Sequence, residues 1–148
     1  MTDKRRKIVV VGWILFSVGV SVSFAHGQTE TTVTGANTVK TVTIVQGAQY
    51  EDNGQYYDPP ITTVEPGSKV IWKNEDYPDQ TDPYVINTVI HTATSGLEPL
   101  PDGRFMTHIL NSGQSSEPIE MPTTEGVYPY FCIFHPNWMN GTVIVRDG

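Results

Sequence analysis

The stretch Tyr128-Pro-Tyr-Phe-Cys132-Ile-Phe-His135-Pro-Asn-Trp-Met139-Asn-Gly141 brings three kinds of metal-binding side chain together. Cys132, His135 and Met139 place a thiol, an imidazole and a thioether within eight residues. A thiolate, two imidazoles and a weak axial thioether are the ligand set of a blue-copper centre. The stretch supplies all of these ligands except a second histidine. His91, upstream, can supply it.

The first 27 residues have the layout of a secretory signal peptide. A basic cluster at residues 3–7 precedes an uncharged, mostly apolar run at residues 8–25, which ends in small residues suited to cleavage. The run has 18 residues, close to the ~20 needed to cross a bilayer. Residues 1–27 are therefore predicted to be either a cleaved signal peptide or an N-terminal membrane anchor. Either way, the rest of the chain is expected to be extracytoplasmic, in a periplasm-like space, at the cell surface or secreted.

Export makes the single cysteine informative. Exported proteins often use cysteines in disulfide pairs, and Cys132 has no second cysteine in its own chain. An odd cysteine in an exported chain indicates an intermolecular bridge, a reactive thiol or a metal ligand. A buried, inert thiol between aromatic residues is the alternative. The nearby His135 and Met139 favour the metal ligand.

The remaining composition fits one small domain. Without residues 1–27 the chain has 121 residues, which is within the usual size of a single domain with its own core. Five basic and fifteen acidic residues give this part a net charge of −10. Such an acidic surface repels nucleic acid and would suit a basic protein partner. We expect a monomer that does not bind nucleic acid.

Short strand-like runs separated by turn residues predict an all-β domain, a sandwich or a barrel. Residues 28–38 are polar and Thr-rich and are expected to form a linker, and the alternation in residues 39–45 predicts an edge strand. Further strands are expected at residues 61–64, 69–73, 88–94, 105–110, 116–121, 127–131 and 141–146, and loops at residues 50–60 and 74–87. The acidic residues between Glu75 and Asp82 are expected to be solvated, with calcium binding as the alternative.

With this layout, residues 39–148 resemble the cupredoxins, small blue-copper proteins such as plastocyanin, amicyanin and pseudoazurin. The resemblance is strongest at residues 127–145, where an aromatic strand, the ligand loop and a Gly-Thr-Val strand follow one another in the family's order. Residues 65–74 are similar to the Pro-Gly turn and strand that precede the family's first ligand. The resemblance implies a Greek-key β-sandwich with one type 1 copper. Its implied ligands are His91, Cys132, His135 and Met139.

The chain departs from the family pattern at two places. Three residues separate His135 from Met139, whereas plastocyanin-like loops usually have four and amicyanin-like loops two. His91 is flanked by Ile90 and Thr92, where relatives often have Pro and Asn. The hydroxyl of Thr92 is expected to be able to form a hydrogen bond across the site.

The resemblance implies an electron carrier between redox partner proteins, not an enzyme. The alternative function is storage of copper or its delivery to an exported oxidase. A multicopper oxidase or nitrite reductase would need further copper sites, and four histidines in total cannot build one within this chain. His108 is expected to be a strand residue that does not touch the metal. His26 would bind copper only as a new N-terminus, a reading that leaves Cys132 without a role.

Overall fold

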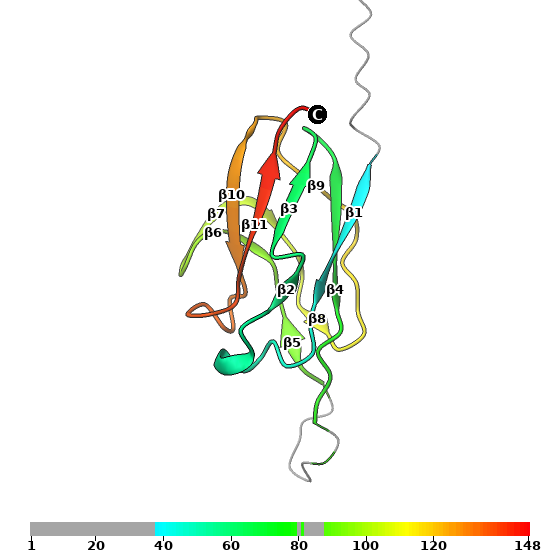
Figure 1. Ribbon diagram of the computed structural model, residues 1–148, viewed down its shortest axis with the longest axis vertical. Coiled ribbons are helices and arrows are strands. Elements are labelled where there is room, and N and C mark those ends of the chain that lie inside the picture. The colour runs from blue at the N-terminus through cyan, green and yellow to red at the C-terminus, as the bar shows by residue number, and fades with distance from the viewer. Residues whose placement is uncertain (1–37, 80, 82–87) are drawn as a thin grey trace, which may run out of the picture. The chain divides into compact units, whose positions relative to one another are not determined.

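The computed structural model describes residues 38–79, 81 and 88–148, whose regular secondary structure is almost entirely β (Figure 1). Their one helix is the short 3-10 turn η1 (Glu51–Asn53). The strands are β1 (Val39–Ile44), β2 (Tyr57–Asp58), β3 (Ile61–Val64), β4 (Lys69–Asn74), β5 (Ile90–His91), β6 (Thr94–Leu97), β7 (Leu100–Met106), β8 (Leu110–Asn111), β9 (Ile119–Glu120), β10 (Gly126–Phe131) and β11 (Asn140–Val145). The all-β prediction is confirmed.

The predicted signal or anchor at residues 1–27, and all but the last residue of the predicted linker at residues 28–38, lie outside the described residues. Both remain predictions. A search of the described residues finds no helix that is long and apolar enough to span a membrane.

The first sheet has the strand order β2-β1-β4-β9. β1 and β4 run parallel, from the pair Val39 and Lys69 to the pair Ile44 and Asn74. Every second side chain of β4 is buried, including Trp72, so one face of this strand packs against the core. β1 lies between β2 and β4 in this sheet, so the prediction that it is an edge strand is wrong. The two-residue strand β2 pairs with the end of β1. It lies within residues 50–60, where the surrounding Gly and Pro residues predict a loop.

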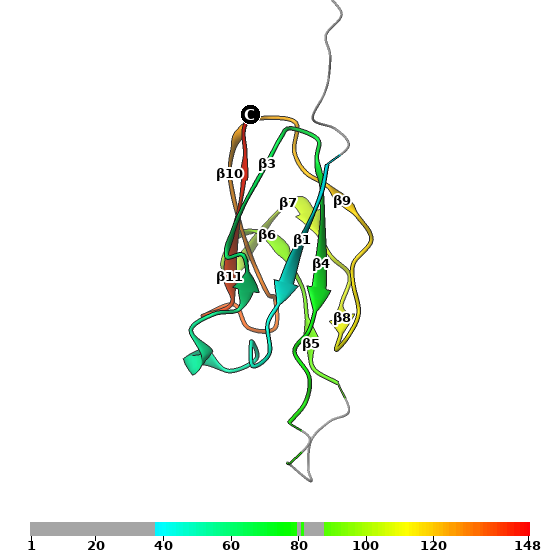
Figure 2. The same cartoon turned by 45° about the vertical axis from the view of Figure 1, so that its right-hand side comes forward.

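The second sheet has the order β3-β11-β10-β6-β7 and contains the strand that leads into the ligand loop. β10 and β11 pair antiparallel, with Tyr130 opposite Gly141 and Phe131 opposite Asn140. The two sheets pack as a sandwich, seen edge-on in Figure 2. The predicted Greek-key sandwich of the cupredoxin type agrees with this architecture.

The core between the sheets is centred on aromatic side chains. Tyr130 makes edge-on contacts with Tyr57 and Trp72, at centroid distances of 4.8 and 5.5 Å. Phe105 stacks on Trp72 at 5.6 Å. The ring of Tyr130 also covers Gly141, because a Cβ built at Gly141 would lie 2.3 Å from that ring. Residue 141 must therefore be glycine for this packing to exist.

A third, two-stranded sheet presents the first predicted ligand. β5 pairs antiparallel with β8, so that His91 lies opposite Leu110. Asn74, at the end of β4, donates its side-chain amide to the carbonyl oxygens of Val89 and Leu110, both at 2.9 Å. The buried Asn74 thus ties this small sheet to the end of the first sheet. The predicted strand at residues 88–94 is in fact two strands, β5 and β6, separated at Thr92 and Ala93.

Candidate metal centre

Cys132 directly follows β10, and a tight loop returns the chain to β11. The backbone N–H of Cys132 donates to the carbonyl oxygen of Met139 at 3.0 Å. The N–H of His135 donates to the carbonyl oxygen of Cys132 at 3.1 Å, and the N–H of Met139 donates to the carbonyl oxygen of His135 at 3.1 Å. These three hydrogen bonds close the loop on itself. The three residues between His135 and Met139 therefore form one compact turn.

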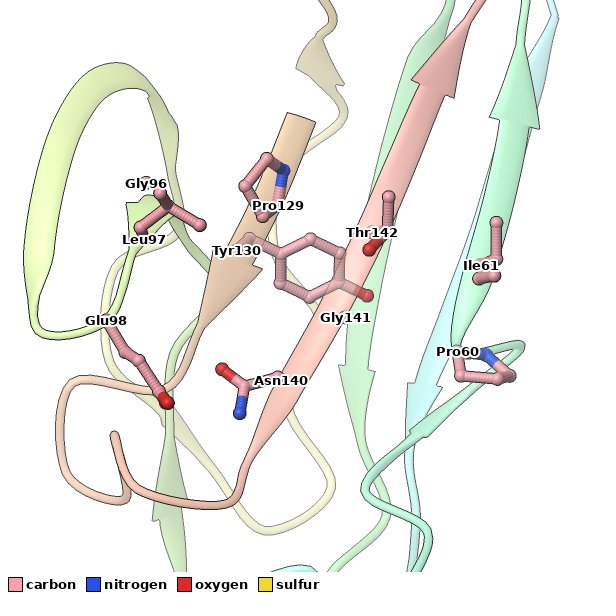
Figure 3. Close-up of a pocket in the computed structure, with 10 residues that line it drawn as sticks. All are labelled: Pro60, Ile61, Gly96, Leu97, Glu98, Pro129, Tyr130, Asn140, Gly141 and Thr142. Carbon is pink, nitrogen blue, oxygen red and sulfur yellow. The ribbon is translucent and has the colours of Figure 1, made fainter. Parts of the chain in front are cut away.

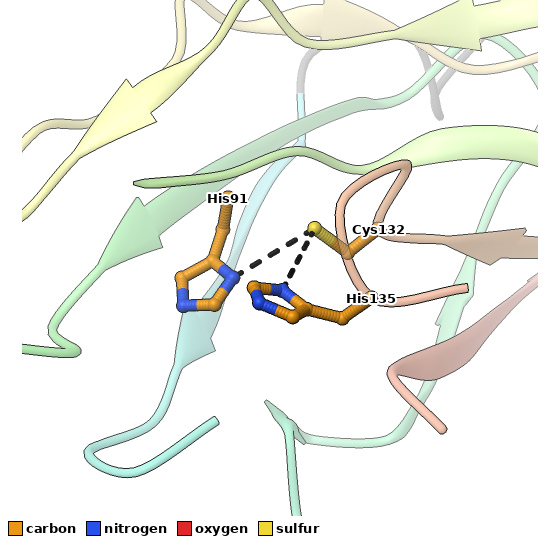
Figure 4. Close-up of side chains that lie close together, drawn as sticks. All are labelled: His91, Cys132 and His135. Atoms are coloured by element: carbon orange, nitrogen blue, oxygen red, sulfur yellow. Dashed lines mark hydrogen bonds between the residues drawn. The ribbon is translucent and has the colours of Figure 1, made fainter. Parts of the chain in front are cut away.

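The fold brings His91, Cys132 and His135 together (Figure 4). The Sγ of Cys132 lies 3.7 Å from Nδ1 of His91 and 3.6 Å from Nδ1 of His135. The ligand atoms of the three residues all lie within 4.8 Å of one another. No other such group of His, Cys, Asp or Glu occurs among residues 38–79, 81 and 88–148.

This spacing fits a bound metal ion. Metal–N and metal–S bonds of ~2.0 and ~2.3 Å, joined at about 115°, separate nitrogen from sulfur by about 3.6 Å. Both imidazoles turn Nδ1 toward the thiol, so all three donors face one point (Figure 4). A thiolate with two imidazoles suits copper in a trigonal site.

The fourth predicted ligand, Met139, is completely buried and packs in the core. Its backbone is fixed to Cys132 and His135 by the loop hydrogen bonds. Its role as the axial ligand remains a prediction. His108 is exposed and is not part of the ligand group, and it lies between β7 and β8 instead of in a strand as expected. His26 lies outside the described residues.

Hydrogen bonds around the thiol favour its ionised form. Burial raises the pKa of Cys132, but hydrogen bonds from His135, His91 and the N–H of Thr92 outweigh burial and lower the pKa to about 6. Burial lowers the pKa of His91, but hydrogen bonds with Asp76 and Cys132 outweigh it and raise that pKa above its ordinary value. The metal-free site therefore favours the thiolate, which is the form that binds metals.

Thr92 forms the hydrogen bonds across the site that were expected of it. Its backbone N–H points at Sγ of Cys132 at 3.4 Å, and its hydroxyl lies 4.0 Å from the same sulfur. The hydroxyl oxygen also accepts the N–H of Ile133 at 3.1 Å and the hydroxyl of Thr94 at 3.3 Å. With both lone pairs used, the hydroxyl hydrogen is left for the thiolate. Thr92 thus joins strand β5, which carries His91, to the loop that carries Cys132.

Sequence reasoning missed one residue of the site, Asp76. Its carboxylate lies 2.9 Å from Nε2 of His91, and both side chains are completely buried. The acidic segment from Glu75 to Asp82 was expected to be solvated, and for Asp76 this expectation is wrong. The segment gave no signal of burial, because the groups that enclose Asp76 come from residues 46–49.

Separate hollows lie on the second sheet and beside the site. The hollow on the second sheet has a volume of about 420 Å³ and crosses β11. Its lining includes Ile61, Leu97, Pro129 and Thr142 (Figure 3). None of the four predicted ligands lines it. A smaller hollow of about 140 Å³ is lined by His135, Phe134, Ile90 and neighbouring residues, and so opens beside the site.

No protein-family model matches the chain, and no curated protein matches it either. Solved structures do. A purple cupredoxin from Nitrosopumilus maritimus is 28% identical, with a TM-score of 0.57, and the match covers 72% of this chain and 99% of that one. An oxidised amicyanin mutant is 19% identical, with a TM-score of 0.50 and coverage of 73% and 82%.

A copper-containing nitrite reductase from Thermus scotoductus is 26% identical, with a TM-score of 0.51. The match covers 75% of this chain but only 23% of the reductase. The similarity therefore concerns one part of that larger enzyme. The described residues of this chain therefore have the cupredoxin fold, and their His-Cys-His group points to a single copper site.

Proposed function

We propose that this chain carries single electrons between extracytoplasmic redox partners through one type 1 copper. The proposed ligands are His91, Cys132, His135 and Met139. Copper in such a site supplies a one-electron couple between Cu(I) and Cu(II). The observation that supports the proposal most strongly is the convergence of two Nδ1 atoms on the buried Cys132 thiol.

The burial of the ligands favours electron transfer over reactions on a substrate. His91 and Cys132 are completely buried, whereas His135 is partly exposed. Ligands fixed between β5 and the closed loop have little room to rearrange. The partly exposed imidazole of His135 is the proposed route of electrons from the centre to the surface.

The surface beside His135 suits close contact with a partner. Ile133 and Phe134, on the same loop, are 43% and 40% exposed. Exposed apolar side chains around an electron exit allow a partner to approach without trapping water. The overall charge of the chain, −7, would attract a basic partner from a distance.

The extracytoplasmic location rests on the signal-like pattern of residues 1–27. The run at residues 8–25 would serve as a membrane tether if it is not cleaved. We propose that the chain acts as a monomer and is not an enzyme. The single ligand group among the described residues is consistent with a carrier and does not provide the second copper site that an oxidase needs.

Copper storage or delivery is the second candidate. Delivery requires ligands that exchange readily, and the buried thiol of Cys132 with its four hydrogen-bond partners argues against exchange. The partly exposed His135 is the one feature that favours it.

The visible and electron-spin-resonance spectra of the copper-loaded full chain test the proposal. A blue-copper centre gives an intense thiolate-to-copper absorption band, and Cys132→Ser should abolish it while the chain remains folded. If the serine variant keeps the same band, Cys132 is not the ligand. Slow transfer of copper to a chelator would separate the carrier from the delivery protein, which should release copper quickly.

A further inference from the structure

Asp76 has a buried carboxylate that is surrounded by hydrogen-bond donors. Its Oδ1 accepts the N–H of Gly47 at 2.8 Å and the amide of Gln46 at 3.3 Å. Its Oδ2 accepts the N–H of Gln49 at 3.0 Å and faces Nε2 of His91 at 2.9 Å. The three partners from residues 46–49 all donate hydrogen, which is the pattern that an ionised, acceptor-only carboxylate satisfies.

The two nitrogens of His91 have separate partners. Nδ1 faces the thiol of Cys132, and Nε2 faces Asp76. A metal on Nδ1 requires that nitrogen to be unprotonated, so the ring hydrogen lies on Nε2 and is donated to Asp76. The contact therefore fixes both the tautomer and the orientation of the imidazole.

The negative charge of Asp76 is close to the centre and is not balanced by a Lys or Arg side chain. Among the described residues, neither Lys nor Arg lies within ion-pair distance of it; the recorded basic partners are Lys73 with Glu75 and Arg104 with Asp102. Charges that are buried interact more strongly than charges in water. A carboxylate that accepts a hydrogen bond from a ligating imidazole also makes that imidazole a stronger donor.

We propose that Asp76 is a positioning residue of the copper centre, which holds His91 with Nδ1 toward the metal and lowers the reduction potential. This inference rests on the proposed function. The potential falls because both the negative charge and the stronger donor favour Cu(II) over Cu(I). Asp76 also connects the ligand to the loop of residues 46–49, so the chain after β1 supports the centre without touching the metal.

The test is Asp76→Asn in the full chain loaded with copper. Removing such an outer partner typically weakens metal binding 10–100-fold. If this loss falls on Cu(II) and not on Cu(I), the potential rises by ~60–120 mV, at 59 mV for each tenfold change in a one-electron couple. Asp79→Asn is the matched control, because Asp79 is an exposed carboxylate of the same segment that accepts hydrogen bonds from Thr81 instead of His91. The control should leave the potential unchanged.

An unchanged potential in a folded, coloured Asp76→Asn variant would overturn the inference while leaving the proposed function intact. Absence of the thiolate band in the wild-type chain would instead remove the proposed function itself. If the asparagine variant does not fold, nitrogen NMR of the reduced wild-type protein decides. A proton on Nε2 of His91 that exchanges slowly with water supports the inference, and an Nε2 without a proton overturns it.

Discussion

Tyr57 donates its phenolic hydroxyl to the carbonyl oxygen of Thr92 across a distance of 2.6 Å, and both groups are buried. Tyr57 lies on β2 in the first sheet, whereas Thr92 follows β5 and contacts the thiol of Cys132. The hydrogen bond therefore supports, from within the core, the backbone that lies against the sulfur.

Tyr57→Phe should destabilise the protein. The substitution keeps the ring contact with Tyr130 but leaves the buried carbonyl of Thr92 without this donor, which costs about 1–3 kcal/mol. Denaturant unfolding of the metal-free chain measures this loss. Tyr56→Phe is the comparison, because the hydroxyl of Tyr56 donates to the backbone carbonyl oxygen of Glu51 at an exposed position. Its removal should lower the free energy of unfolding much less. Equal stability of Tyr57→Phe and wild type would mean that the hydrogen bond contributes nothing.

Met139→Gln should keep copper bound but lower the reduction potential. A glutamine oxygen is a harder axial ligand than a thioether and stabilises Cu(II) more. Voltammetry of the loaded chain gives the potential. Because Met139 is completely buried, the fold of the variant should first be checked by circular dichroism. An unchanged potential in a folded variant would show that the three-residue spacing after His135 holds this side chain away from the metal.

The thiol of the metal-free chain should titrate near pH 6. The pKa of Cys132 is about 6 in the folded chain, whereas an unfolded cysteine titrates near 8.5. Because the folded pKa is the lower one, the thiolate contributes stability that is complete above the unfolded value and is lost as the pH falls through about 6. Thiolate ultraviolet absorbance against pH measures the midpoint. A midpoint near 8.5 would contradict the hydrogen-bonded thiolate.

Phe134→Ser should slow electron self-exchange between oxidised and reduced copies of the protein. Loss of an apolar ring from a docking contact costs on the order of 1.5 kcal/mol, about tenfold in rate. The slowing should persist at high salt, because it does not depend on charge. NMR line broadening of mixed samples gives the rate.

Val127→Ser is the control for this experiment. Val127 is 68% exposed and lies at the opposite end of β10 from the ligand loop. Its loss should leave the exchange rate unchanged. If both variants slow exchange equally, or neither does, the face beside His135 is not the docking surface. Trp138 is less suited to this test, because it is partly buried and packs on the core.

The sequence predicted the parts of the site that depend on residue type and order. Cys132 and His135 were recognisable because few residue types bind soft metals and these two residues lie close together in the sequence. His91 lies far upstream and was predicted because it could supply the second imidazole that the ligand set needs. β3, β4 and β10 were predicted closely because apolar runs bounded by turn residues have a local cause. These features depend on neighbours in the chain.

What the sequence did not reveal depends on contacts between distant segments. β2 lies among Gly and Pro residues and is a strand only because β1 is available to pair with it. The sequence predicts a solvated Asp76, since an isolated carboxylate is rarely buried. Its burial is tolerated because residues 46–49, almost 30 positions earlier, supply the donors.

Gly141 is not a ligand, but the absence of a side chain there affects the copper centre. Any larger residue at this position would displace the ring of Tyr130, which packs against Tyr57. Tyr57 in turn holds the carbonyl of Thr92 beside the thiol. A substitution at Gly141 would therefore change the colour and the reduction potential of the protein without replacing any atom bound to the metal. Variants at Gly141 should be compared with variants of the site residues when their spectra are interpreted.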